Sequence, residues 1–356
     1  LVSLFSNLSM IVYLLFLNGR YGIQGLAVAF CVGWLFQFLF LVPFLKKKRF
    51  HYSPGLDFKS PDIKKVAVLT LPLFVSALAQ PINQLISSNL SSGISESGVA
   101  TVNYAYNAYF IVAGVFSYAL TNMFFPEMSR RFASRDTDGA TDICRDMLST
   151  ITAVIMPIMV FLAACSKPII RIIYQRGRFT AEDTLMVSLL LTVYAFGMIF
   201  LSWQDILNKF FYSMQKSVIP MIAAASGILV NLILSLIFTP FLGLTGLALS
   251  TVIAGALMTL ILSLFTLKYT RNIFKKDFFA EVFKLILGGV SVFAVCSLML
   301  RVLNFDTSVL LQTAYTLLTL AASAAAYLGV LFVMRSKSIN NIMNLFGKGG
   351  KTNDVQ

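Results

Sequence analysis

The chain has 356 residues, of which 58% are hydrophobic and 12% are charged, and its formal net charge is +13. A mean hydropathy of +0.81 is far above that of a soluble domain and indicates a helical protein that crosses a membrane several times. The sequence has no phosphate-binding Gly-Lys loop, hydrolase nucleophile motif or closely spaced cysteine pair, so it favours neither an enzyme, nor an ATP-driven pump, nor a metal or disulfide site.

Apolar runs divide the chain into ten predicted spans, since about 20 helical residues cross a hydrocarbon core of ~30 Å. They cover residues 2–18, 22–45, 66–90, 99–125, 147–165, 184–204, 218–239, 245–267, 283–303 and 308–334. The predicted fold class is therefore an all-α polytopic membrane protein. Because the chain opens inside an apolar run, without a charged leader, we expect an N-terminally truncated piece of a longer protein.

Basic residues gather in alternate connections between these spans. All but six of the 28 lysines and arginines lie at 46–65, 130–145, 209–216, 268–284 and 335–351. The positive-inside rule places these segments, and both ends of the chain, in the cytoplasm. This distribution explains the positive charge as membrane topology, so no nucleic-acid partner is expected.

Two turns with similar sequences are predicted on the side of the membrane opposite to the basic connections. Gly22–Ala27 reads GIQGLA and Gly243–Ala248 reads GLTGLA, and each follows one apolar span and begins another. A weak internal repeat of this kind is typical of a transporter built from two related lobes.

The third and fourth spans are unusually polar and are joined by the polar loop 91–98. Amides that faced lipid would lack hydrogen-bond partners, so they should face other helices or a wet cavity. Two pairs with a spacing of four share a helical face, Asn83 with Ser87 and Asn103 with Asn107. We predict a polar transmembrane path; the alternative is that these side chains only hold helices together. The predicted lining residues are Asn83, Ser87, Asn103, Tyr104, Tyr106 and Asn107.

The outer connection 166–184 carries four of the six remaining basic residues, Lys167, Arg171, Arg176 and Arg178. Isoleucines alternate with these charges, which is typical of a short amphipathic helix on a membrane surface. The arginines there would meet anionic head groups or a phosphorylated substrate, or merely extend toward lipid phosphates.

Two ionisable residues, Asp205 and Lys209, fall near the inner end of the sixth span. Their spacing of four allows them to pair along a helix, which lowers the cost of holding either charge near the membrane. We predict an ion pair, with a cytoplasmic gate as the alternative. If they pair, reversing both charges should preserve function better than reversing either one.

Five groups of residues carry a recognisable pattern: Ile82–Ser88 with Asn103–Tyr106, Phe125–Arg130, Tyr174–Thr180, Phe211–Pro220, and Asn231 with Gly243–Ala248. Together they resemble the corresponding segments of the MurJ (MviN) family of lipid II flippases. The resemblance covers most of residues 80–260 and implies that the ten spans correspond to the family's fifth to fourteenth, with four missing in front.

The resemblance implies a two-lobed, MATE-like fold of the multidrug/oligosaccharidyl-lipid/polysaccharide (MOP) exporter superfamily. Residues 1–65 would be the last two spans of the N-terminal lobe and a cytoplasmic linker, and 66–267 a six-span C-terminal lobe. Residues 268–334 would be two additional spans, and 335–356 a cytoplasmic tail.

The implied function is to flip lipid II, a lipid-linked anionic oligosaccharide, between leaflets of the bacterial cytoplasmic membrane by alternating access. The expected protein is a monomer surrounded by membrane lipids, near cell-wall synthesis enzymes. The alternatives are a flippase for another polysaccharide or teichoic lipid precursor, a MATE-type antiporter, or an inactive relative that scaffolds cell-wall enzymes.

This chain departs from the family pattern at positions that carry charge. Asn107 stands where the family has an arginine thought to meet pyrophosphate, and an amide donates hydrogen bonds without charge. Acidic residues of some relatives align with Ser87 and Ser235, which with Asn231 and Thr251 would form only a weak site for a monovalent cation. No cofactor is expected beyond coupling to such a cation or to the membrane potential.

Overall fold

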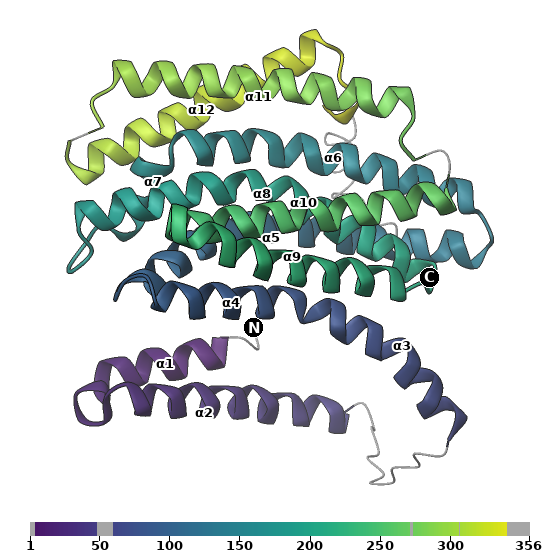
Figure 1. Ribbon diagram of the computed structural model, residues 1–356, viewed down its shortest axis with the longest axis horizontal. Coiled ribbons are helices and arrows are strands. Elements are labelled where there is room, and N and C mark those ends of the chain that lie inside the picture. The colour runs from purple at the N-terminus through teal and green to yellow at the C-terminus, as the bar shows by residue number, and fades with distance from the viewer. Residues whose placement is uncertain (1–3, 48–59, 271–272, 306, 340–356) are drawn as a thin grey trace. The chain divides into compact units, whose positions relative to one another are not determined.

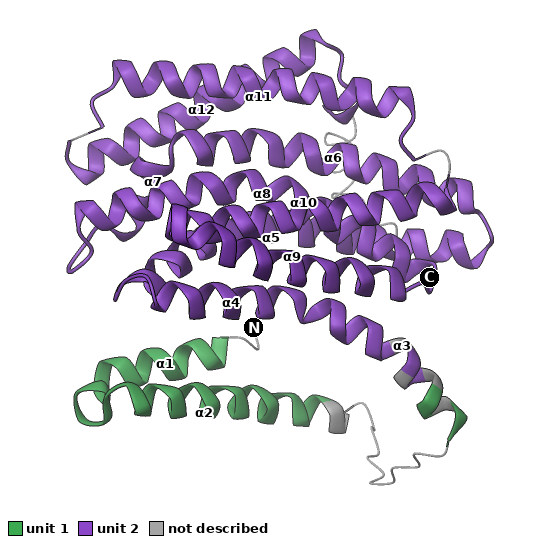
Figure 2. Cartoon of the chain, in the orientation of Figure 1, with its two compact units in different colours: residues 1–64 green, residues 65–356 purple. Residues whose placement is uncertain are grey.

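The computed structural model describes residues 4–47, 60–270, 273–305 and 307–339 (Figure 1). The predicted linker residues 48–59 and most of the predicted tail, 340–356, lie outside the described residues. The described chain forms helices that belong to two compact units, residues 1–64 and 65–356 (Figure 2).

Eight of the described helices are long and apolar enough to cross a membrane. They are α2 (Asn18–Lys47), α5 (Gly98–Ala133), α6 (Thr137–Ala164), α8 (Ala181–Ser213), α9 (Val218–Leu242), α10 (Leu244–Tyr269), α11 (Lys276–Val302) and α12 (Val309–Val333). They coincide with eight of the ten predicted spans. The first predicted span contains the shorter helix α1 (Leu4–Phe16).

The third predicted span, 66–90, is not one helix, which corrects the sequence prediction. It is broken at Leu78 into α3 (Pro61–Ala77) and α4 (Ala79–Ser92). Pro81 explains the break, because proline has no N–H to donate to the carbonyl of Ala77 and its ring crowds that carbonyl. The polar residues of this span therefore lie on α4, a separate short helix.

Helix α8 forms the centre of the larger unit and packs against α5, α6 and α10. Its residues Tyr194, Phe210 and Phe211 are almost completely buried. Helix α4 packs on both α5 and α9. The pair α11 and α12 joins this unit through α6, where Tyr327 donates a 2.8 Å hydrogen bond to the carbonyl oxygen of Ala153.

The connection 166–184 contains the short helix α7 (Ser166–Tyr174), which confirms the helix predicted there. One side of α7 is buried, including Ile170, and Lys167 on it is exposed. Arg171 donates to the carbonyl oxygens of Phe305 and Thr307, at 3.1 and 3.4 Å. Arg171 therefore fastens α7 to the connection between α11 and α12, while Arg176 and Arg178 lie beyond the end of this helix.

The two turns that resemble each other in sequence also have the same backbone conformation. Gly22 has φ 54° and ψ −147°, and Gly243 has φ 56° and ψ −136°. Residues with a side chain rarely adopt this positive φ, so both turns require glycine. The internal repeat predicted from sequence is thus a shared helix–turn–helix geometry, once in each unit.

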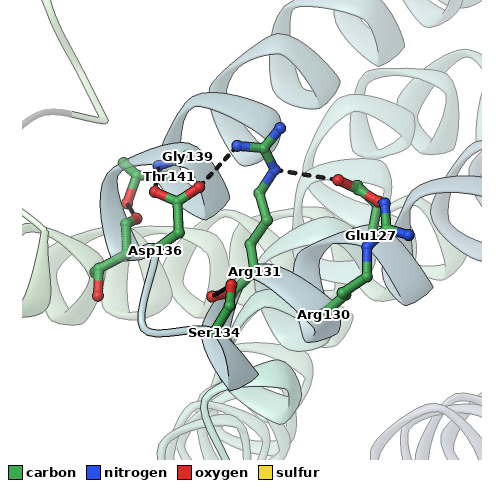
Figure 3. A network of polar contacts seen from close by, with 8 residues as sticks. Glu127, Arg130, Arg131, Ser134, Asp136, Gly139 and Thr141 are labelled. Atoms are coloured by element: carbon green, nitrogen blue, oxygen red, sulfur yellow. Dashed lines mark hydrogen bonds and ion pairs between the residues drawn. The ribbon is translucent and has the colours of Figure 1, made fainter.

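A polar network closes the connection between α5 and α6 (Figure 3). Arg131 lies between two carboxylates, with its Nε 3.2 Å from Oε1 of Glu127 and its Nη1 2.8 Å from Oδ2 of Asp136. Arg130 also pairs with Glu127. The other oxygen of Asp136 accepts a 2.9 Å hydrogen bond from the backbone N–H of Gly139 and so caps α6.

The hydrogen bond from Gly139, followed by the Arg131 guanidinium, lowers the pKa of Asp136 from its ordinary value of 3.8. Because the folded pKa is depressed, the stabilisation is complete above the unfolded value and disappears as the pH falls through the folded pKa. Asp136→Ala is therefore expected to lower the unfolding temperature in detergent at neutral pH, and the difference from wild type should shrink at the lowest pH values. Asp138→Ala removes a neighbouring exposed charge and is the control; equal effects of both variants would contradict the capping role.

Ser134 lies exposed in this connection and provides a test of the predicted topology. In a background without native cysteines, a cysteine at Ser134 should not react with an impermeant thiol reagent applied to intact cells. A cysteine at Ser95, which is exposed at the other end of α5, should react. Labelling at Ser134 and not at Ser95 would show that the chain crosses the membrane in the opposite orientation to the predicted one.

Candidate functional site

The predicted polar face is centred on α4, which is held between α5 and α9. Asn83 and Ser87 of α4 are buried, and Nδ2 of Asn231 in α9 donates a 3.0 Å hydrogen bond to Oδ1 of Asn83. Across the other interface, Nε2 of Gln84 donates to Oδ1 of Asn103 at 3.2 Å. The amides of α4 therefore hold it to both neighbours, as the alternative interpretation expected.

Four of the six predicted lining residues border one small cavity. Asn83, Ser87, Asn103 and Tyr106 surround a space of about 10 Å³, together with Thr251 of α10. An adjoining space of about 20 Å³ is bordered by Gln80, Gln204 and again Thr251. Since a water molecule needs at least ~10–15 Å³ of such space, each holds about one water and neither admits a sugar.

The other two predicted residues lie elsewhere. Tyr104 contacts the connection 166–184, with its ring centroid 4.7 Å from that of Tyr174 and 5.5 Å from that of Phe179. Asn107 is exposed and does not border either small cavity. A spacing of four placed Asn103 and Asn107 on one face, but only Asn103 reaches α4.

The exposed faces of these helices differ in polarity. Every exposed residue of α9 is apolar, which suits contact with lipid. Helices α4 and α5 instead expose Gln84, Asn107, Tyr118 and Asn122 among apolar residues. Uncharged amides and phenols are costly against hydrocarbon, so this polar face, defined by these four residues, needs water, ligand or protein against it.

A row of buried polar atoms runs along the inner face of α9. Asn231, Ser235 and Thr239 follow at spacings of four, and Oδ1 of Asn231 and both hydroxyls have no hydrogen-bond partner among the described residues. Thr251 binds the carbonyl oxygen of Leu247 at 3.0 Å and borders the same cavity as Ser87. The predicted cation-site residues thus lie on three neighbouring helices and supply only neutral oxygens.

The predicted lining residues did not include Gln80, Gln204 and Thr239, which also belong to this polar region. Gln80 accepts a 3.0 Å hydrogen bond from the hydroxyl of Tyr106, and Gln204 donates to the carbonyl oxygen of Gly255 at 2.9 Å. An amide inside an apolar run was the available signal for both glutamines. Thr239 follows from continuing the spacing of Asn231 and Ser235 by one turn.

The predicted ion pair between Asp205 and Lys209 is not formed. Within the described chain no carboxylate oxygen of Asp205 lies within 4.0 Å of the Lys209 ammonium. Lys209 lies over the ring of Phe125 instead, with Nζ 5.0 Å from the ring centroid. A cation above an aromatic face is itself a favourable contact, which competes with pairing along α8.

A family model described as "Lipid II flippase MurJ" matches residues 2–318. A probable lipid II flippase MurJ of Vibrio cholerae is 28% identical over 227 residues, which are 64% of this chain and 43% of the relative. That of Rhizobium meliloti is 25% identical over 303 residues, 83% of this chain and 56% of the relative. The chain spans about half the length of the curated relatives it matches.

Solved structures give the same fold. "Lipid II flippase MurJ, inward closed conformation" superposes with a TM-score of 0.74 at 24% identity, over 94% of this chain and 66% of that one. A MATE transporter in a bent conformation gives a TM-score of 0.51 at 18% identity, over 79% of this chain and 68% of that one. The predicted MOP-like, all-α fold of a multi-pass inner-membrane protein is confirmed, and the family match over residues 2–318 shows that the chain belongs to the lipid II flippase MurJ family.

Proposed function

We propose that the full-length protein flips lipid II from the inner to the outer leaflet of the cytoplasmic membrane by alternating access. Family membership supports this function, and the polar face of α4 and α5 is the structural observation that carries it. Lipid would cover the apolar face of α9, whereas the polar face requires a hydrated or ligand-filled space. The basic connections, including Arg130 and Arg131, would lie in the cytoplasm with the C-terminus.

The polar face suits the physical problem of moving such a substrate. A sugar–pyrophosphate head group cannot enter hydrocarbon unaided, because burying an unpaired charge costs several kcal/mol or more. Amides such as Gln84 and Asn107 can replace water around it. The seam between α4, α5 and α9 is too small for this role, so the substrate would pass along the exposed polar face of α4 and α5.

We propose that this protein couples only weakly to a cation. Ser87, Asn231, Ser235 and Thr251 supply neutral oxygens and no carboxylate to offset the desolvation of an ion. The membrane potential acting on charges of the substrate is the stronger source of energy, since one charge moved across 100 mV is worth about 2.3 kcal/mol.

Complementation tests the proposed function. The complete gene should restore growth to cells depleted of their own lipid II flippase, and lipid II should become accessible at the outer leaflet. A protein that reaches the membrane in normal amount and leaves lipid II inaccessible, while a curated relative restores access, would refute it. Restored export of a different lipid-linked polymer in the same cells would favour the alternative substrate class.

A further inference from the structure

A second candidate site lies at the end of the bundle opposite to Arg130 and Arg131. It is a surface pocket of about 460 Å³ between the first turn of α5 and the segment that joins α7 to α8. This volume is within the range of small-molecule sites and far exceeds that of the seam around Asn83. We call it the arginine pocket; the lining residues that matter are Ser97, Tyr104, Tyr174, Arg176, Arg178 and Asp183.

The two arginines outnumber the single carboxylate that lines this pocket, so its net charge is positive. Arg176 and Arg178 are exposed, and neither guanidinium makes an ion pair or hydrogen bond within the described part of the chain. Asp183 also lines the pocket, but its Oδ2 accepts hydrogen bonds from the backbone N–H and the hydroxyl of Thr180, both at 2.8 Å. That carboxylate is committed to capping α8.

The start of α5 adds positive potential on the opposite wall. Ser97 precedes the helix, and its side chain makes no capping hydrogen bond. The first N–H groups of a helix point toward an anion placed there and carry the positive end of the helix dipole. Two guanidinium groups and a helix N-terminus that lacks a side-chain cap thus surround one space.

The pocket is built by defined contacts. Gly177 has φ +62°, and the N–H of Phe179 binds the carbonyl oxygen of Arg176 at 3.2 Å, which closes a tight turn with one arginine on each side of the glycine. The ring of Phe179 then packs on Tyr174 and Tyr104, with centroids 5.9 and 5.5 Å away. The turn is held against α5 by three aromatic rings.

We propose that the arginine pocket binds a lipid-borne phosphate or pyrophosphate group. Each guanidinium group can donate two parallel hydrogen bonds to the oxygens of a phosphate, a geometry that the lysine ammonium does not provide. The amphipathic helix α7 and the aromatic rings are features of the membrane–water boundary, where lipid head groups lie. This binding does not depend on flipping; only a preference for pyrophosphate would rest on the proposed function.

Direct binding to the purified full-length protein tests this proposal. The probes are a polyprenyl pyrophosphate and phosphatidylglycerol, each titrated into neutral nanodiscs and quantified by native mass spectrometry. The double variant Arg176→Gln/Arg178→Gln should lose at least tenfold in affinity. The matched control, Lys167→Gln/Arg301→Gln, removes the same charge from two exposed residues outside the pocket and should change affinity less than twofold.

The two probes separate the possible sources of the phosphate. Tighter binding of the pyrophosphate lipid by wild type identifies a lipid-linked substrate, and equal binding identifies general head groups. Affinities of the pocket variant equal to those of wild type for both lipids overturn the proposal.

A second measurement uses only the wild-type protein, so it tests the proposal even if the double variant does not fold. Bound pyrophosphate lipid should protect Arg176 and Arg178 from phenylglyoxal, as read from peptide masses, and should leave Arg301 reactive. Absence of protection would overturn the proposal without bearing on transport, because flipping is measured separately by complementation.

Discussion

Asn107→Leu is expected to reduce flipping by the full-length protein about tenfold and to leave its unfolding temperature unchanged. Asn107 is exposed on the polar face of α5, so leucine costs nothing in packing but removes a hydrogen-bond donor from the proposed substrate path. A hydrogen bond to a charged group is worth about 1.5–3 kcal/mol, and 1.4 kcal/mol corresponds to a factor of ten. Outer-leaflet lipid II and thermal unfolding are the two measurements.

A second variant, Asn107→Arg, tests whether position 107 meets a negatively charged group. If this face meets a pyrophosphate, arginine restores a charge-assisted donor, and transport should be kept or improved. Ile111→Leu, one turn further along the exposed side of α5, is the control and should behave as wild type. Full growth with Asn107→Leu together with failed insertion of Asn107→Arg would show that the position faces lipid.

Gly246→Ala is expected to destabilise the protein by about 1–3 kcal/mol, the usual cost of overpacking a fitted interface. A Cβ atom at Gly246 would lie 2.8 Å from both the backbone carbon and the oxygen of Phe238, and backbone atoms cannot rotate away as a side chain can. Helices α9 and α10 would have to separate. Gly246→Val should be worse and should reduce the amount of folded protein in the membrane.

Gly329→Ala is the matched control, because a Cβ at Gly329 in α12 meets no atom within 4 Å. Alanine should be neutral or slightly stabilising there, since it favours helix more than glycine does. Thermal unfolding in the same detergent compares the variants. Equal unfolding temperatures for Gly246→Ala and Gly329→Ala would show that α9 and α10 do not approach as closely as the structure has them.

Long, strongly apolar helices were predictable from sequence because hydropathy alone selects them. The break at Leu78 was missed because the apolar run continues through Pro81, and composition does not report a lost backbone hydrogen bond. A search for prolines inside each apolar run would have pointed to a break in the helix near Pro81. Ends such as that of α5 were predicted too short, since helices continue past the hydrocarbon into polar residues.

For the candidate site, the sequence predicted which residues share a face of one helix, but not which residues of other helices contact that face. Spacing grouped Asn83 with Ser87, but the partner Asn231 is far away in sequence and was suggested only by family resemblance. Spacing also suggested that Asp205 pairs with Lys209, whereas a ring from another helix, Phe125, occupies the space over the ammonium. The partner that a side chain contacts depends on how the helices pack together, and the sequence of a single helix does not contain that information.

The matching turns at Gly22 and Gly243 have a consequence for the substitutions that each of them tolerates. Their dihedral angles agree closely although the residues between the glycines differ, Ile23-Gln24 in one and Leu244-Thr245 in the other. An elbow defined by backbone torsion places little demand on side-chain identity. Substitutions at the residues between the glycines should therefore be tolerated alike in both turns, whereas replacing Gly22 or Gly243 should disturb either turn in the same way.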